Sequence, residues 1–168
     1  MNILVLNGPN LNLLGERESS LYGAMTLAQL VKKVTAHARR RGAKVRARQS
    51  NSEGTLIDIL HSHRKWADAI VFNPGAYTHY SYALRDAVAA IRVPTIEVHL
   101  SDVTRREPFR RVSVIEPVCA GRRFGKGLQS YFEAIDVLVS LNRHSSSRPN
   151  PSPAEVYATG SRMAKYKK

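Results

Sequence analysis

Two polar stretches that directly follow apolar runs contain the residues best suited to chemistry. The first is Asn73–Ser81, with amide, hydroxyl and imidazole side chains, and the second is Glu97–Ser101. In an open parallel sheet, ligands bind at the carboxyl ends of the strands, so side chains placed just after each strand can meet there. The pattern predicts an enzyme that acts on a small polar substrate.

His99 is the strongest candidate for a general acid. Glu97 lies two residues earlier, so the two side chains share one face of a strand. Imidazole titrates near neutral pH, and a neighbouring carboxylate favours its cation. A histidine standing alone would be interpreted as a buried ring with backbone partners. Glu97 and Ser101 beside it favour the catalytic interpretation.

Tyr22 is the candidate for a general base. A phenol has an ordinary pKa of about 10 and becomes a usable base only where positive charges stabilise the phenolate. Arg17 lies in the same segment of the chain. On the residues alone, Tyr22 is equally well a half-buried anchor of its loop. The arginines that could bind an anionic group, or lie on a solvated helix face, are Arg105, Arg106, Arg110 and Arg111.

The other histidines and Ser81 carry weaker signals. His61 and His63 have no acidic or cysteine companion at metal-ligand spacing, so we expect both at the surface and no metal site. His37 and His144 receive no role. Ser81 lacks the G-x-S-x-G turn that exposes the serine of many hydrolases, so we do not interpret it as a nucleophile.

Alternating strands and helices position these groups. Apolar periodicity predicts strands at residues 2–7, 43–49, 69–72, 95–100 and 118–124, and helices at 26–41, 53–65, 82–91 and 128–141. This alternation is typical of an open parallel sheet covered by helices on both faces. The polar groups expected to meet at its carboxyl edge are Asn7, Asn10, Asn73, His79, Glu97, His99 and Ser101.

The connection over residues 8–25 is unusually long for a strand-to-helix loop, which commonly has about 2–6 residues. It contains Arg17 and Tyr22, with Gly15 and Gly23 as possible hinges. We therefore expect a lid that closes over the site. The leucines at positions 11, 13 and 14 indicate that the first half of the segment packs against the protein.

Length and composition predict one domain in a reducing, cytoplasmic setting. The chain has 168 residues, one cysteine (Cys119), no apolar run of membrane-spanning length and no signal-peptide pattern at its start. We expect a single catalytic domain at residues 1–142. Residues 143–168, rich in Ser, Pro, Asn and Lys, are expected to be a basic and mostly disordered tail.

The formal charge of +13 is concentrated in two places. Residues 32–48 contain eight basic side chains and no acidic one, and residues 142–168 have a net charge of +5, which leaves the rest of the chain neutral. No aromatic residues are interleaved with these charges as in single-strand binding grooves. We expect a solvated basic face and a solubilising tail, with neither a nucleic acid nor a membrane as partner.

Six motifs, in order and without an evident gap from about residue 2 to residue 141, resemble the type II 3-dehydroquinate dehydratase family. They are Leu6–Glu18 with Tyr22 and Gly23, Gln49–Gly54, Asn73–Ser81, Arg85 with Asp86, Glu97–Ser101, and Arg106–Arg110. The resemblance implies a flavodoxin-like domain, with a five-stranded parallel sheet and helices on both faces, usually assembled as a dodecamer of trimers. It also implies dehydration of 3-dehydroquinate to 3-dehydroshikimate without a metal or Schiff base, in the shikimate pathway of aromatic amino acid biosynthesis or in quinate catabolism.

Individual roles follow by position from this resemblance. Tyr22 matches the general base, and Arg17 matches the lid arginine that keeps it ionised. His99 matches the general acid, and Asn10 matches the residue that positions a water at the developing enolate. The matching substrate-binding positions are Asn73, His79, Leu100, Ser101 and Arg110, with Asp86 supplied across a trimer interface.

Three positions depart from the resemblance, namely Ser19, Asp102 and Ser130. None is a catalytic position, so we expect altered affinity at most. Two other functions stay open on the residues alone. One is a flavodoxin-like binding module whose basic helix and tail contact nucleic acid or an acidic partner, and the other is a different carbonyl-directed lyase or isomerase on the same scaffold.

Overall fold

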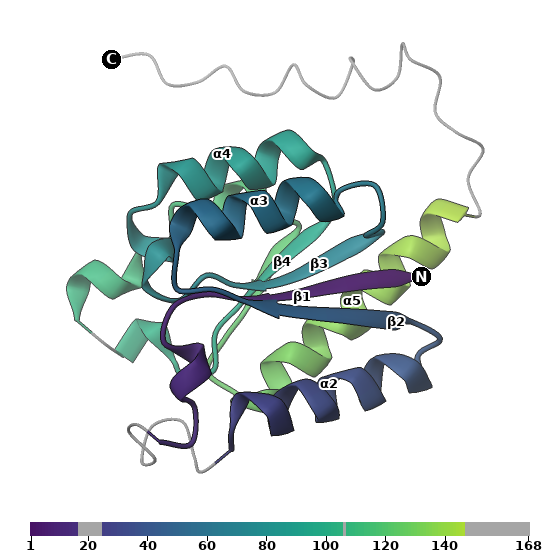
Figure 1. The fold of residues 1–168 in the computed structure, drawn as a ribbon, viewed down its shortest axis with the longest axis horizontal. Coiled ribbons are helices and arrows are strands. Elements are labelled where there is room, and N and C mark those ends of the chain that lie inside the picture. Colours follow the sequence, from purple (N-terminus) through teal and green to yellow (C-terminus); the bar gives the residue numbers. More distant parts are fainter. Residues whose placement is uncertain (17–24, 106, 147–168) are drawn as a thin grey trace.

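The fold is a five-stranded parallel sheet between two pairs of helices (Figure 1). The computed structural model describes residues 1–16, 25–105 and 107–146. The strand order is β2-β1-β3-β4-β5. The strands are β1 (Asn2–Asn7), β2 (Lys44–Gln49), β3 (Ala69–Asn73), β4 (Thr95–Val98) and β5 (Gly121–Arg123). The doubly wound parallel sheet predicted from the sequence is confirmed.

Helices cover both faces of this sheet. Helices α3 (Glu53–His63) and α4 (Tyr82–Ile91) lie on one face, and α2 (Leu27–Arg40) and α5 (Leu128–Ser146) lie on the other (Figure 1). Thr26 begins α2 with a capping box, in which its hydroxyl accepts from the Gln29 N–H and the Gln29 side chain accepts from the Thr26 N–H. Ser81 begins α4 in the same position, accepting from the Leu84 N–H at 3.0 Å. Ser81 is therefore a helix cap.

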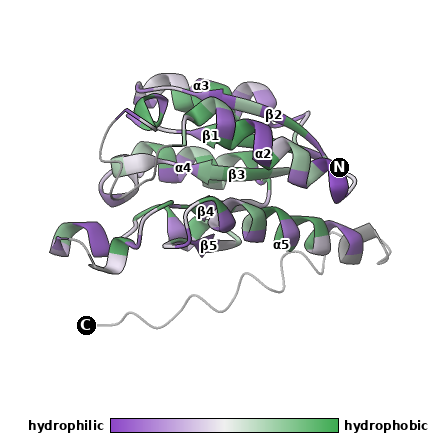
Figure 2. Ribbon diagram, turned by 90° about the horizontal axis from the view of Figure 1, so that it is seen from below, coloured by the Kyte–Doolittle hydropathy of each residue, from purple (hydrophilic) through white to green (hydrophobic). Residues whose placement is uncertain are grey.

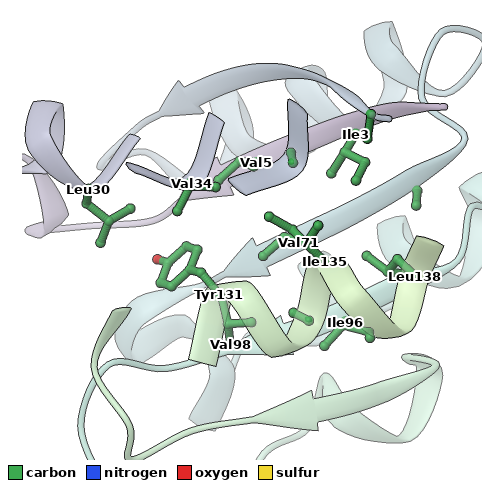
Figure 3. Close-up of a cluster of buried hydrophobic side chains, with 14 of the residues drawn as sticks. Ile3, Val5, Leu30, Val34, Val71, Ile96, Val98, Tyr131, Ile135 and Leu138 are labelled. Atoms are coloured by element: carbon green, nitrogen blue, oxygen red, sulfur yellow. The ribbon is translucent and has the colours of Figure 1, made fainter. Parts of the chain in front are cut away.

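Two hydrophobic layers hold the sheet between its helices. Alternate residues of β1 point to opposite faces, and all of Ile3, Leu4, Val5 and Leu6 are fully buried. Figure 3 shows Ile3 and Val5 packed with side chains of α2 and α5, among them Leu30. Figure 2 shows hydrophobic residues along β1 and β3, with hydrophobic and hydrophilic residues mixed along α2 and α5. Such mixing is expected of helices with one buried side.

Several element boundaries differ from the sequence prediction. β5 covers only Gly121–Arg123, because residues 116–118 form a 3-10 turn containing Pro117, which has no N–H for a strand ladder. β4 ends at Val98, two residues early, although the His99 N–H still donates to the Arg123 carbonyl of β5 at 2.9 Å. α5 continues to Ser146, past the expected end at residue 141, because no glycine or proline interrupts the sequence before Pro149. The first residues of the expected tail are thus helical.

A partly exposed cluster of polar contacts joins α2 to α5. The His37 ring donates from Nε2 to Asp136 Oδ1 at 2.7 Å and stacks on Phe132 with ring centroids 4.3 Å apart. Arg41 adds contacts to both oxygens of the same carboxylate, at 2.9 and 3.1 Å. His37, which received no role from the sequence, connects two helices. His61 is exposed, as expected, whereas His63 is half-buried with its ring edge-on to Trp66.

No described helix has both the length and the apolar character needed to cross a lipid bilayer. Within residues 1–16, 25–105 and 107–146, no three His, Cys, Asp or Glu side chains are grouped as ligands for a metal ion.

Candidate active site

A cavity of about 200 Å³ opens where the chain leaves β1, β3 and β4. This is the carboxyl edge of the sheet, where the two polar stretches were predicted to meet. The polar residues that line the cavity are Asn10, Asn73, His79, His99, Ser101 and Arg110. Pro9, Leu11, Leu14, Gly75, Ala76, Leu100 and Val103 complete its wall. The cavity is smaller than the roughly 300–1,000 Å³ typical of pockets for drug-sized ligands, so it suits a small metabolite.

His99 and Glu97 form a buried hydrogen-bonded pair at the base of this cavity. His99 Nε2 lies 2.6 Å from Glu97 Oε1, and the Glu97 side chain is completely buried. Since a carboxylate accepts, Nε2 is the donor. Nδ1 is then the ring nitrogen left for a ligand in the cavity. Glu97 itself lies behind His99 and contributes no surface to the cavity.

Two hydroxyl groups complete the surroundings of Glu97. Thr78 donates to Oε1 at 2.6 Å, and Ser113 donates to Oε2 at 2.7 Å. Burial is the largest single influence and acts to raise the pKa of Glu97. The hydrogen bond and charge of His99, with the bonds from Thr78 and Ser113, outweigh it, so the pKa of Glu97 lies below its ordinary value. Glu97 is thus an ionised carboxylate that holds the His99 ring in one orientation.

His79 forms a second polar wall and is best described as a neutral ring. Its Nδ1 lies 2.7 Å from the carbonyl oxygen of Val112, so Nδ1 carries the proton. Burial, as the main cause, lowers the pKa of His79, and the positive charges of His99 and Arg110 act in the same direction. The hydrogen bond to Val112 and the charge of Glu97 oppose this lowering. With a lowered pKa and Nδ1 protonated, Nε2 can accept a hydrogen bond from a ligand.

Asn73 is fixed by a buried network that crosses the sheet edge. Its Nδ2 donates to the hydroxyl of Tyr131 at 2.9 Å, and this hydroxyl donates to Asn7 Oδ1 at 2.8 Å. Asn73 Oδ1 accepts from the Gly75 N–H at 3.2 Å. Burial raises the pKa of Tyr131, which therefore remains a neutral phenol able to donate. Asn7 does not line the cavity and instead supports its neighbour from behind.

The turns after β1 and β3 meet backbone to backbone. Gly8 donates to the Asn73 carbonyl at 2.7 Å, and a Cβ at position 8 would lie 2.6 Å from the carbonyl oxygen of Pro74. Only glycine fits there without moving one of the turns. Asn10 follows in the left-handed region, with φ 65°, and its N–H donates to the Asn51 side chain at 2.9 Å. Asparagine tolerates this conformation better than most residues.

Arg110 brings a positive charge to the cavity from a short helix at Pro108–Arg111. Its guanidinium lies 3.0 Å from Glu107 and stacks over the Phe109 ring at 4.8 Å. Arg111 lies outside the cavity lining. The Arg105 side chain and Arg106 fall outside the part of the chain that the structure describes. Of the two arginines whose side chains are described, Arg110 lines the cavity and Arg111 does not.

Several other predicted residues do not meet in the described structure. Tyr22 and Arg17, with most of the expected lid, fall outside the described residues. The first part of that segment packs down through Leu11 and Leu14, which are buried, but Leu13 is exposed, contrary to expectation. Asp86 lies on α4 with a 75% exposed side chain, pairs with Arg85 at 3.1 Å and is absent from the cavity wall.

Asp102 and Ser130, two of the three positions that depart from the family resemblance, each make local hydrogen bonds outside the cavity wall. Asp102 accepts from the Thr104 N–H at 3.0 Å and from its hydroxyl at 2.6 Å, and so caps a short turn outside the cavity wall. Ser130 is fully buried, and its hydroxyl accepts from the Lys126 N–H at 3.2 Å. Ser19 lies outside the described residues.

Sequence reasoning missed the residues that support the site without lining the cavity. Thr78, Ser113, Arg122 and Tyr131 act on Glu97 or Asn73 from distant positions in the chain. Only Tyr131 had a signal, as a hydroxylated aromatic on the apolar side of a helix. Such a group needs a hydrogen-bond partner when it is buried.

The family model described as "Dehydroquinase class II" matches residues 1–139. The chain belongs to the class II dehydroquinase family. A 3-dehydroquinate dehydratase from Pelotomaculum thermopropionicum is 55% identical over 141 residues, which cover 84% of this chain and 98% of the relative. One from Bacillus pumilus is 52% identical over 139 residues, covering 83% and 95%. This agrees with the family resemblance found in the sequence motifs.

Solved structures extend the similarity to the fold of this dehydroquinase. The crystal structure of a type II dehydroquinase from Butyrivibrio crossotus matches with a TM-score of 0.80 and 49% identity, covering 82% of this chain and 97% of the other. A 3-dehydroquinate dehydratase-like protein from Bifidobacterium longum matches with a TM-score of 0.64 and 27% identity, covering 85% and 98%. The strand order and the helices on both faces are thus those of the class II dehydroquinases.

Proposed function

We propose that this chain is a type II 3-dehydroquinate dehydratase, a hydro-lyase that removes water from 3-dehydroquinate to give 3-dehydroshikimate. The observation that supports it most directly is the buried Glu97–His99 pair, 2.6 Å apart, whose second imidazole nitrogen is free to face a small polar cavity. A protonated ring held in this way can deliver a proton to a leaving hydroxyl. Family membership supplies the substrate.

The reaction requires a base on one side of the substrate ring and an acid on the other. Tyr22, with Arg17 stabilising its phenolate, would take the proton from the carbon beside the ketone. The resulting enolate oxygen carries negative charge, which a water held by Asn10 would stabilise by hydrogen bonding. His99 would then give its Nδ1 proton to the hydroxyl on the next carbon as the C–O bond breaks.

Atoms balance over this cycle without a further reactant. One proton moves from substrate carbon to Tyr22, and one moves from His99 to the departing hydroxyl, which leaves as water. Transfer of the Tyr22 proton to His99 through solvent restores both groups. Glu97 keeps its charge throughout and stabilises the imidazolium before the proton is given up.

Binding groups would hold the substrate between these two residues. Arg110 offers N–H donors to substrate oxygens, and the neutral Nε2 of His79 offers an acceptor to a ring hydroxyl. Asn73, Ser101 and the backbone at Leu100 would supply the remaining hydrogen bonds. Closure of the segment with Arg17 and Tyr22 would exclude water and bring the base to the substrate.

We propose in addition that the enzyme works in the cytoplasm as trimers assembled into a dodecamer, in aromatic amino acid biosynthesis or quinate catabolism. Asp86 supports the assembly, because its side chain is 75% exposed and so is accessible to a neighbouring copy. Exposed apolar residues of the same region support it too, namely Tyr80, Tyr82, Phe109 and Val112. Sedimentation equilibrium tests the assembly, and a monomer that is fully active would refute it.

An absorbance assay with 3-dehydroquinate tests the proposed reaction. The conjugated enone of the product absorbs in the near ultraviolet, and its formation should be insensitive to both chelator and borohydride. Tyr22→Phe and His99→Gln should each lower kcat by about 10²-fold or more while binding is largely kept, as is typical for loss of a general acid or base. His61→Gln is the matched control, because His61 is exposed and does not line the cavity.

Each outcome of this assay decides something. Lack of product formation by folded wild-type enzyme would overturn the proposed function. Near-wild-type turnover by His99→Gln would be compatible with the proposed dehydration but would show that His99 is not its acid. An equal loss in His61→Gln would show that the losses do not come from the site.

A further inference from the structure

Arg122 is a buried arginine that lies against Glu97 and outside the cavity. It sits on β5 directly opposite Glu97 in the parallel ladder, so both side chains lie on the same face of the sheet. Its side chain is 7% exposed, and Nε lies 3.6 Å from Glu97 Oε1. Nη1 donates to Glu116 at 3.0 Å, and the guanidinium stacks over Phe124 at 4.8 Å.

The guanidinium is incompletely paired for such a buried charge. Over the described residues, neither Nε nor Nη2 has a hydrogen-bond partner. Burying a charge without full pairing costs stability, and replacing buried ion pairs with apolar side chains is often neutral or stabilising. Fold stability alone therefore gives no reason for an arginine at this position.

The position brings a fixed positive charge next to the Glu97–His99 pair. Glu97 Oε1 accepts from Thr78 and His99, both at 2.6 Å, and Arg122 lies next to the same oxygen. Arginine remains protonated at every pH of interest. Its charge therefore stabilises the Glu97 carboxylate both before and after His99 gives up a proton. It also repels a protonated His99 ring, which donates to the same oxygen.

We propose that Arg122 is a positioning residue that acts through Glu97, as a permanent counter-charge that keeps the carboxylate ionised when His99 is neutral. It would prevent the proton on His99 Nε2 from moving to Glu97, so the proton given to the leaving group comes from Nδ1. This role rests on the proposed dehydration, in which His99 is the acid. It adds to that reaction a residue that touches neither substrate nor cavity.

Other titratable groups also face this pair and must be considered. His79 and Arg110 approach from the cavity side, and the charges of Arg110 and of the pair all act on the pKa of the neutral His79 ring. Cys119 lies beside Glu97, and its thiol has a pKa raised to about 12, chiefly by burial, so it is neutral. Glu116 partly balances Arg122 at the surface. Arg122 is the only cation among these groups that lies within 4 Å of Glu97 in the described structure other than His99 itself.

The test compares Arg122→Met with Arg122→Lys and with a matched control, Arg123→Met. Methionine is of similar length without charge, lysine keeps the charge, and Arg123 is the next residue on β5, whose side chain points to the opposite face. The readouts are the pH profile of kcat, KM, and the titration of the His99 ring followed by NMR of ¹⁵N-labelled histidine. Thermal unfolding checks that each variant is folded.

We expect Arg122→Met to move the alkaline limb of kcat and the midpoint of the His99 ring titration upward by about 1 pH unit. A charge within about 4–6 Å commonly shifts the group it faces by 1–3 units, and Arg122 faces Glu97 at 3.6 Å, so the effect passed on to His99 should lie at the lower end of this range. At pH 7, kcat should fall about 3- to 10-fold, because the acid is weaker, while KM should change less than about 2-fold, because Arg122 does not line the cavity. Arg122→Lys should restore both midpoints, and Arg123→Met should leave them unchanged.

The outcomes separate this role from a structural one and from the proposed function. A folded Arg122→Met with both midpoints unchanged would overturn the proposal, even if its melting temperature is lower. An equal shift in Arg123→Met would overturn it as well, since it would show a general charge effect. If Arg122→Met does not fold, Arg122→Lys and Arg122→Gln give the same comparison of charge. Inactive wild-type enzyme would refute the dehydration, whereas the NMR titration would still test the coupling of Arg122 to His99.

Discussion

The hydroxyl of Tyr131 offers the sharpest test of how buried hydrogen bonds fix Asn73 at the cavity wall. It donates to Asn7 at 2.8 Å and accepts from Asn73 at 2.9 Å, and the side chain is fully buried. Tyr131→Phe removes both hydrogen bonds and leaves two buried polar atoms without a partner. In the part of the chain that the structure describes, Asn7 Nδ2 already has none, so the whole Asn7 amide would become unsatisfied.

The expected loss follows from these two bonds. A net hydrogen bond contributes about 1 kcal/mol, and an unsatisfied buried group costs about 1–3 kcal/mol. Tyr131→Phe should therefore lower the free energy of unfolding by about 2–4 kcal/mol. Asn73 would also lose its anchor at the cavity wall, so KM for 3-dehydroquinate should rise while the pH profile keeps its shape.

Urea unfolding at pH 7 measures this loss, with both proteins at the same concentration because assembly contributes to apparent stability. Tyr77→Phe is the matched control. Its hydroxyl donates to the Asn51 carbonyl at 3.0 Å in an exposed position, and we expect its removal to cost about 0.5–1 kcal/mol. A loss in Tyr131→Phe no larger than in Tyr77→Phe, at unchanged m value, would refute the reasoning that the buried network stabilises the site.

Two further predictions concern titratable groups. The pKa of Glu97 is lower in the folded than in the unfolded protein, so its contribution to stability is complete above its ordinary value of 4.5 and is lost as the pH falls through the folded value. Urea unfolding between pH 7 and pH 3 should show a shallower decline for Glu97→Gln than for wild type, and equal slopes would contradict this. The pKa of about 12 for Cys119 should make its alkylation by iodoacetamide at pH 8 on the order of 10³-fold slower in folded than in urea-unfolded protein. Similar rates in the two states would show that the thiol is not protected by burial.

The sheet and its carboxyl-edge site could be predicted because local patterns determine them. Strands such as residues 2–7 are continuous apolar runs, and helices such as residues 82–91 begin at a capping serine and follow a 3.6-residue period. The short β5 strand was harder, because Arg122 and Arg123 carry no apolar signal and their strand is set by pairing with β4. The end of α5 was placed too early, because a polar composition was interpreted as a break in the helix.

Residues that act on the site through other residues could not be predicted. Ser113 and Thr78 reach Glu97 from positions 16 and 19 residues away in the chain, and Tyr131 reaches Asn7 across 124 residues. No periodicity or motif connects such pairs, since their contact depends on the path of the folded chain.

The backbone contact between the turns after β1 and β3 couples the two walls of the cavity mechanically. At Gly8 and Gly75 an added Cβ would meet Pro74 and Pro9 at 2.6 and 3.2 Å, so each turn leaves the other no room for a side chain. A force that displaces one turn must displace the other as well. Asn10 and His79, which follow the two turns, should therefore keep their mutual spacing during thermal motion. Adaptation to a substrate of different size is accordingly expected from the β4 side of the cavity and from Arg110.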